Sequence, residues 1–369
     1  MYLKSVGLFR AHCWVAGFCL AIPISYPSVP FYWLAFAVFL SSLFYLFIEV
    51  NIARLAIVLI TIAVVVVSNI LPGTYPVAVR QIIGTLLFPL FVYFGWAIPA
   101  PLYVIRGFFF ACVLWSVLVL IAFLVLAPYD EGLLLFSVPE YRLWGEGYFP
   151  DWPNYFSFVL ALGFLVGKVL LNKSALSLIC LVAALLTTSR TPLIALFLAV
   201  LYLYSLMPKR VLVPVSLISV VLVFIFLVFL FSNWHSEFVQ RLTLFSDRWA
   251  VFSSAIDLFW ESPVFGNGSV LLDESVGNTA AASFHNFYLD ILVRHGLVGL
   301  VVYMLLLLPN PAGIRDKQLA PIIMIILFFL VGSLFQNYLR HPHLVMMYSC
   351  FLALTFGLKK KAYGARRAK

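Results

Sequence analysis

Four short polar stretches interrupt an otherwise apolar chain, and each holds residues suited to phosphate or sugar chemistry. The first runs from Thr187 to Pro192 and contains Arg190, beside the expected start of a helix. A guanidinium close to the free N–H groups of a helix N-terminus forms an anion site. An arginine whose side chain extends to lipid headgroups would produce the same pattern, so this stretch alone leaves both interpretations open.

The second stretch contains Arg241 and Arg248 and predicts a helix on the membrane surface. After Ser246, apolar residues recur at helical spacing: Trp249, Phe252, Ile256 and Phe259. This periodicity is typical of an amphipathic helix that lies in the interface. Turn-forming residues at 261–268 then end the segment. The two arginines share a face if one helix carries both, although a surface helix without a catalytic role would show the same pattern.

The third stretch begins with His285 and Asn286 at the expected outer end of a helix. An imidazole at such a helix mouth can take a proton from a sugar hydroxyl, or it can serve as a polar anchor. Asp290 and Arg294 follow at the spacing of a favourable helical ion pair, for which we predict a structural role. His295, deeper in the same helix, is expected to be packed or paired.

The fourth stretch, Arg340–His343, adds a cation and two imidazoles. No carboxylate or cysteine accompanies His341 and His343, so this set is not one that a metal ion prefers. The five cysteines all lie in apolar runs, without a CxxC pair or a Cys/His cluster, and are expected to be buried. We therefore predict neither a metal site nor a disulfide framework.

The elements that position these residues must be membrane helices. Of the 369 residues, 64% are hydrophobic and only 10% are charged, which no soluble fold of this length could bury. The apolar runs predict an all-α, polytopic transmembrane bundle of about twelve spans. The spans lie near 9–26, 30–48, 54–71, 80–98, 107–126, 154–171, 174–188, 191–207, 211–231, 286–308, 319–336 and 342–358.

Two features within these spans carry further expectations. The basic N-terminal start lacks a small-residue cleavage site, so we expect the first helix to be retained. In the tenth span, Gly296 and Gly299 are expected to permit close packing against neighbouring helices.

The distribution of basic residues predicts which connections lie outside. With a cytoplasmic N-terminus and twelve spans, 16 of the 23 Lys and Arg residues fall on the cytoplasmic side and 7 on the other. A single integral membrane domain then covers 1–369. The long connections 127–153 and 232–285 become periplasmic loops, and the second contains the amphipathic helix. The net charge of +9 reflects topology and anionic lipid rather than nucleic-acid binding.

Lysine and arginine are sorted unequally by this topology. All nine lysines fall inside, whereas the seven outer cations are all arginines. An outward-facing phosphate site would explain the difference, because guanidinium forms bidentate contacts with phosphate and stays charged. The spans are poor in ionisable residues, unlike those of ion-coupled transporters. The sequence therefore favours interfacial chemistry over a transport site at the membrane midplane.

Taken in order, these stretches resemble the O-antigen ligase/polymerase family of bacterial membrane glycosyltransferases. The resemblance covers residues 190–300 best and the first half of the chain by topology. The motifs, in chain order, are Ser189-Arg190-Thr191, Arg248-Trp249, Pro263, Gly266-Asn267-Gly268, His285-Asn286, Leu289 and Gly296-Leu297-Val298-Gly299. The segment from Tyr141-Arg142 to Asn154 also looks like the family's loop before the sixth span. The chain departs from the family pattern at Arg294, where many members carry an acidic or polar residue.

The resemblance implies a metal-independent enzyme with a GT-C-like fold and no cofactor, located in the bacterial inner membrane. Its donor would be a glycan on undecaprenyl diphosphate, and its active site would face the periplasm. Arg190 and Arg248 would hold the diphosphate, with Arg241 as a further cation. His285 would activate the acceptor hydroxyl, and we expect Asn286 and Arg340 to support the site.

The acceptor separates the two activities of the family. A ligase would use a sugar of the lipid A-core, whereas a polymerase would use a second lipid-linked glycan and would have a chain-length regulator as its partner. Both belong to lipopolysaccharide or surface polysaccharide biosynthesis, and the shared motifs do not choose between them. The alternative from another class of protein is a flippase for lipid-linked oligosaccharides or another membrane transporter.

Overall fold

Every element in the described part of the chain is a helix, as the sequence predicts. The computed structural model describes residues 2–21, 52–70, 79–98, 100–126, 153–187, 189–205, 246–268, 284, 286–309 and 319–367. The α-helices are α1 (Tyr2–Leu20), α3 (Ile52–Ile70), α4 (Val79–Ala97), α5 (Pro101–Leu126), α7 (Pro153–Leu165), α8 (Ser174–Leu186), α9 (Arg190–Ser205), α12 (Ser246–Glu261), α13 (Phe287–Leu307), α15 (Ala320–Phe335) and α16 (Pro342–Arg367). A π-helix, η2 (Val166–Leu170), continues α7, and a short 3₁₀-helix, η4 (Tyr338–Arg340), precedes α16.

Three of these helices are long and apolar enough to cross a membrane: α3, α5 and α13. Five shorter apolar helical segments lie within α7 with η2, α8, α9, α15 and α16. The predicted spans 30–48 and 211–231 lie outside the described residues. Membrane helices are therefore present, and the count of about twelve spans stays a prediction.

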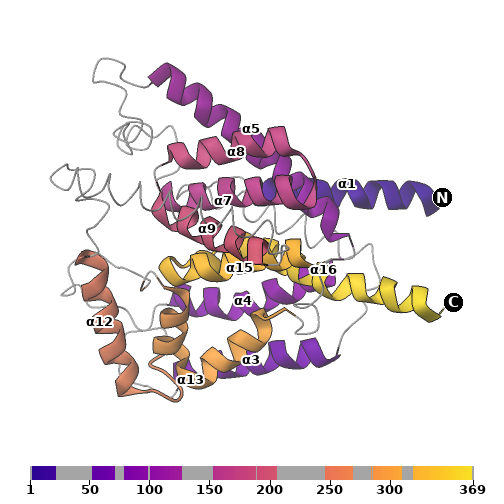
Figure 1. Cartoon of the computed structure of the whole chain (residues 1–369). Helices are drawn as coiled ribbons and strands as arrows, with labels where there is room; N and C mark the ends of the chain where they lie inside the picture. The colour runs from indigo at the N-terminus through magenta and orange to yellow at the C-terminus, as the bar shows by residue number, and fades with distance from the viewer. Residues whose placement is uncertain are drawn as a thin grey trace.

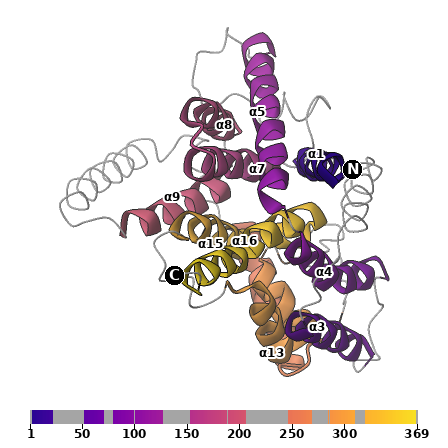
Figure 2. The ribbon, with the colours of Figure 1, turned by 90° about the vertical axis from the view of Figure 1, so that its right-hand side faces the viewer.

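The two ends of the helix bundle differ. Both chain termini lie at one end, and α12 lies across the opposite end, transverse to most of the other helices (Figure 1). In the view along the bundle, both termini lie on the side of the molecule that is turned toward the viewer (Figure 2). The distribution of basic residues predicts that α12 and the termini lie on opposite sides of a membrane, and this assignment of sides stays a prediction. We call the end that carries α12 the α12 end.

Apolar side chains occupy both the interior and the exterior of the bundle. Phe108, Phe156 and Phe328 are fully buried in one continuous core. Large apolar side chains also cover the outer surfaces of α3 and α5, where they include Leu59, Ile60, Val66, Phe110, Leu114 and Ile121. Exposed apolar surface of this extent suits a lipid environment rather than water.

Glycines bring α1 and α5 into close contact. A Cβ atom added at Gly17 would lie 1.8 Å from the Val104 carbonyl oxygen, and one added at Gly107 would lie 1.9 Å from the Trp14 carbonyl oxygen. Membrane helices gain little from apolar burial against each other, so such backbone proximity is a principal source of their association. This pair forms part of the rigid frame on which the α12 end is built.

Candidate functional site

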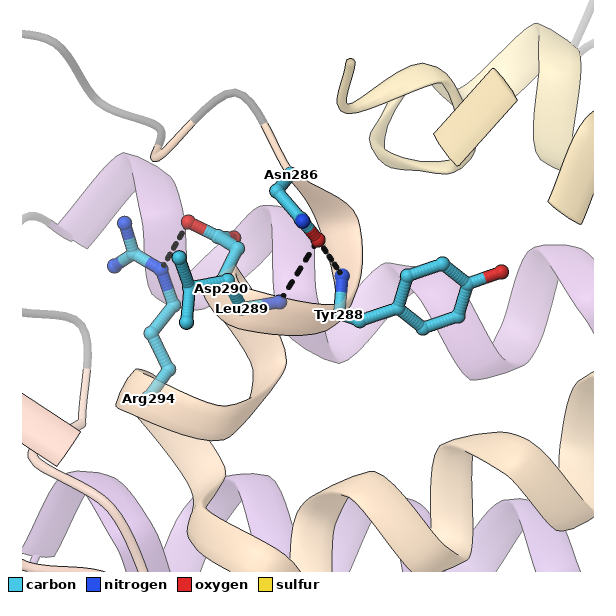
Figure 3. Close-up of polar contacts among 5 residues, drawn as sticks. All are labelled: Asn286, Tyr288, Leu289, Asp290 and Arg294. Atoms are coloured by element: carbon cyan, nitrogen blue, oxygen red, sulfur yellow. Dashed lines mark hydrogen bonds and ion pairs between the residues drawn. The ribbon is translucent and has the colours of Figure 1, made fainter. Parts of the chain in front are cut away.

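Asn286 fixes the start of α13, immediately after the predicted catalytic histidine. Its backbone is extended, and its side-chain Oδ1 accepts hydrogen bonds from the N–H groups of Tyr288 (3.0 Å) and Leu289 (3.1 Å) (Figure 3). This is an N-cap, which satisfies two backbone donors that have no partner within the helix. The supporting role expected of Asn286 thus has a physical form, because the cap sets where the chain enters α13.

Asp290 and Arg294 form the ion pair that their spacing predicts. Arg294 Nε lies 3.1 Å from Asp290 Oδ1, and the two side chains are only 2% and 6% exposed (Figure 3). Together with His295, Thr85 and Tyr303, the pair lines a small cavity between α4 and α13. Burial makes the pair costly to break, since loss of one partner leaves an uncompensated charge.

The tenth span predicted near 286–308 is present as α13, a candidate membrane span, and its helix is interrupted at Gly296. Gly296 has φ +63° and ψ −165°, a conformation outside the helical region that L side chains rarely adopt. It divides α13 into a first segment, 287–295, and a second segment, 297–307. Gly296 also permits the close packing that the sequence predicts, since a Cβ atom there would lie 2.2 Å from the Val264 carbonyl oxygen.

His295 is paired and packed, as expected. Its Nδ1 lies 2.7 Å from Ser68 Oγ on α3, and both side chains are buried. The imidazole also stacks on the Tyr303 ring, with centroids 5.7 Å apart and planes 9° apart. The Ser68 contact joins the end of the first α13 segment to α3, and the Tyr303 contact joins it to the second α13 segment.

Helix α12 (Ser246–Glu261) is present where apolar residues at helical spacing predict a helix, and Arg248 lies in its first turn. Its inner face is apolar and packs on residues 284–293: Val251, Ala255, Leu258 and Phe259 contact a cluster with Phe284, Leu289 and Val293. Ile256 and Trp260 are 48% and 69% exposed, so part of the predicted apolar stripe faces away from α13. The helix of Arg248 thus adjoins the segment that follows His285.

The polar break around Arg190 is also present. α8 ends at Leu186, where Thr187 Oγ1 donates to the Ala184 carbonyl at 2.6 Å, and Arg190 is the first residue of α9. The neighbouring Ser189 and Thr191 are buried. Arg190 therefore occupies a helix N-terminus, the position at which an arginine and free N–H groups favour an anion.

Residues 175–304 match the family model described as O-Antigen ligase. This part of the chain is thus similar to the O-antigen ligase family. The match runs from α8 to the second segment of α13 and confirms the resemblance that the ordered motifs predict. No curated protein matches the chain.

The matched residues 175–304 contain all of the predicted catalytic and diphosphate-binding residues, but the structure does not describe them all. Arg241 and His285 lie outside the described residues. For Arg190 and Arg248, the described feature is the backbone position in α9 and α12. Their roles stay predictions, and the described neighbours Asn286, Asp290 and Ser189 define the local frame.

A second polar cluster lies beyond the matched residues. Arg340 ends η4, and the Tyr155 ring lies close to the rings of His341 and His343, with centroids 4.6 Å and 4.9 Å away. Within the described ranges, no group of three or more His, Cys, Asp or Glu side chains could hold a metal ion. The cluster joins the start of α7 to the start of α16.

Sequence reasoning missed two contributors to the site. Ser68 lies 227 positions before its partner His295 and has no local signal that marks it. Residues 263–268 have the composition of a turn, which predicts a change of direction and not a partner. The positive φ values of Gly266 and Gly268 are the feature that a turn composition does signal.

Proposed function

We propose that this chain transfers a glycan from undecaprenyl diphosphate to an acceptor hydroxyl at the α12 end, on the periplasmic side of a bacterial inner membrane. The observation that carries the proposal is the match of residues 175–304 to the O-antigen ligase family model. The packing of α12 on residues 284–293 supports it, since this packing brings the helix of Arg248 beside the residues that adjoin His285.

In the proposed reaction, His285 accepts the proton of the acceptor hydroxyl as its oxygen attacks the anomeric carbon of the donor sugar. The bond between that carbon and the phosphate oxygen breaks, and the lipid diphosphate leaves with the electron pair. Arg190 and Arg248 stabilise the charge that develops on the diphosphate, and Arg241 adds a further cation. The fixed charges of the arginines make the step independent of a metal ion.

The direct test is glycan transfer by purified protein in the presence of a chelator, with lipid-linked donor and acceptor. We expect His285→Ala to bind the donor and to transfer glycan about 10²–10⁴ times more slowly than the unmodified protein. His12→Ala, a change of the same kind on α1, should keep normal transfer. Normal transfer by His285→Ala would remove the general-base role, and chelator-sensitive transfer would remove the metal-independent mechanism.

A deletion strain identifies the acceptor. Loss of a ligase leaves uncapped lipid A-core and an accumulated lipid-linked polymer. Loss of a polymerase leaves core capped by a single short oligosaccharide. Movement of lipid-linked donor across vesicle membranes without any transfer would instead support the flippase alternative.

A further inference from the structure

The interruption of α13 leaves four backbone groups without their helical partners. In a continuous helix, the N–H groups of Leu297 and Val298 would donate to the carbonyls four residues earlier, at Val293 and Arg294. Here Leu297 N–H donates to the Pro263 carbonyl at 2.9 Å, and Val298 N–H donates to the Val264 carbonyl at 3.2 Å. Residues 263 and 264, which follow α12, thus accept the hydrogen bonds of the Leu297 and Val298 N–H groups.

The same segment supplies the two missing donors. Asn267 N–H donates to the Val293 carbonyl at 2.8 Å, and Gly268 N–H donates to the Arg294 carbonyl at 2.9 Å. Residues 263–268, which we call the clasp, therefore form four hydrogen bonds in place of the two that a continuous helix would make between these groups. A membrane interior offers no water for such groups, and an unpaired one costs several kcal/mol. The interruption of α13 is stable because the clasp is bound to it.

Glycine is required both in the clasp and at the point of α13 that the clasp contacts. Gly266, Gly268 and Gly296 all have positive φ, between +63° and +74°. A Cβ atom added at Gly296 would lie 2.2 Å from the Val264 carbonyl oxygen, and one added at Gly266 would lie 2.3 Å from the Arg294 carbonyl carbon. The two backbones are in direct contact, so neither segment can shift without the other.

The clasp is also joined to α12. Gly266 N–H donates to the Ser262 carbonyl at 2.9 Å, and the Asn267 side-chain Nδ2 donates to the Leu258 carbonyl in the last turn of α12. On its other side, a Cβ atom at Gly268 would lie 2.7 Å from the Ser68 carbonyl oxygen of α3. One hydrogen-bonded unit thus runs from α12 through the clasp to the first α13 segment, and α3 supports it.

We infer that the clasp is a positioning element, which holds the Arg248 helix at a fixed separation from the segment that follows His285. The inference rests on the proposed function, in which Arg248 binds the leaving diphosphate and His285 activates the acceptor. Gly266, Gly296 and Asn267 act through these two residues and do not touch substrate. The clasp sets the distance over which the two substrates meet.

Two variants test the clasp at different strengths. Asn267→Ala removes the side-chain bond to α12 and leaves the four backbone bonds in place, whereas Gly296→Ala opposes the interruption itself. We expect kcat for transfer to fall on the order of tenfold to a hundredfold in both, with KM for the lipid-linked donor nearly unchanged, because small displacements of reacting groups have effects of this size. Gly107→Ala is the matched control, since Gly107 has an equally close backbone contact far from the clasp.

A distance measurement separates positioning from a general loss of structure. Spin labels at Ile256→Cys on α12 and Val301→Cys on the second α13 segment occupy exposed positions, whereas the five native cysteines are buried. The unmodified clasp should give one narrow distance distribution, and Asn267→Ala and Gly296→Ala should broaden or shift it. If Gly296→Ala does not fold, Asn267→Ala decides the test.

The outcomes are distinguishable. Normal kcat in the folded clasp variants, or a reduced kcat with an unaltered distance distribution, would overturn the inference and leave the proposed function standing. Normal transfer by both Arg248→Ala and His285→Ala would overturn the proposed function, and the positioning role would fall with it.

Discussion

Two close glycine contacts, one between α1 and α5 and one between α13 and the clasp, differ in what happens to the backbone. Gly17 of α1 and Gly107 of α5 each lie against the backbone of the partner helix, and both helices remain continuous. Gly296 and Gly266 bring α13 and the clasp equally close, but here α13 is interrupted and its hydrogen bonds pass to the clasp.

The α1–α5 contact belongs to the scaffold, whereas the α13 interruption belongs to the proposed site. The α1–α5 contact sets only the spacing of two helices, because each helix satisfies its own backbone groups. The α13 interruption changes the direction of a helix at membrane depth, and this requires a substitute partner for every freed group. Changes at the α1–α5 contact should therefore alter stability alone, whereas changes around α13 should alter the transfer rate as well.

The largest effect on stability is expected at the buried ion pair of the first α13 segment. Asp290→Ala should lower the free energy of unfolding by about 3–5 kcal/mol, because the buried Arg294 guanidinium loses the carboxylate that lies 3.1 Å from its Nε. Asp290→Leu combined with Arg294→Met should recover most of that loss, since an apolar pair has no charge to desolvate. Chemical denaturation of the purified protein in detergent measures both. A double variant less stable than Asp290→Ala would mean that the pair is not the main interaction of Arg294.

The helices and the local pairs of this region could be predicted from the sequence. Hydropathy predicts an all-helical chain, the Asp290–Arg294 spacing predicts the ion pair, and the apolar periodicity after Ser246 predicts the helix α12. Each depends on residues only a few positions apart, where helical geometry fixes what can touch.

The interruption of α13 could not be predicted in the same way. A glycine in an apolar run, such as Gly296, suits a close helix crossing as well as a break, and sequence analysis favours the crossing. The deciding partners lie in the clasp, and Ser68 lies farther still, on α3. Local spacing carries no information about such contacts, so the path of the site backbone emerges only from the three-dimensional arrangement.

At the α1–α5 contact we predict a smaller loss of stability and no change in the transfer rate. Gly107→Ala inserts a methyl group against the Trp14 carbonyl, so α1 and α5 must separate. Such overpacking costs about 1–3 kcal/mol of stability. The transfer rate per folded molecule should stay normal, as measured by kcat after correction for the folded fraction. A reduced kcat would show that the α1–α5 contact also shapes the site, and would break the comparison.

Arg248→Lys tests the proposed diphosphate contact. The substitution keeps the positive charge in the first turn of α12 but loses the bidentate geometry of guanidinium. We expect a loss of about 1.5 kcal/mol of transition-state binding, the value of one charge-assisted hydrogen bond, or roughly tenfold in kcat/KM. Arg54→Lys is the matched control, because Arg54 stacks over the Trp96 ring in the described scaffold. Equal transfer by Arg248→Lys and the unmodified protein would exclude a bidentate phosphate contact.

The smallest effect is expected at the N-cap of α13. It tests whether the transfer rate depends on where this helix begins. Asn286→Ala removes the acceptor for the Tyr288 and Leu289 N–H groups, which costs about 1 kcal/mol locally. Global stability should change little, but the first turn should fray, and that turn directly follows His285. We expect kcat to fall a few-fold, in proportion to the time that the turn spends open.

Asn286→Asp makes this prediction specific. A carboxylate accepts the same two hydrogen bonds and interacts favourably with the positive end of the helix dipole, so transfer should stay close to normal. Ser116→Ala, which deletes a buried hydrogen bond to the Cys112 carbonyl within α5, controls for the loss of one polar contact far from the site. A kcat that falls equally in Asn286→Ala and Ser116→Ala would mean that the cap contributes only stability. A fall in kcat confined to Asn286→Ala would show that the transfer rate depends on the start of α13, because the loss of a buried hydrogen bond within α5 would then leave kcat unchanged.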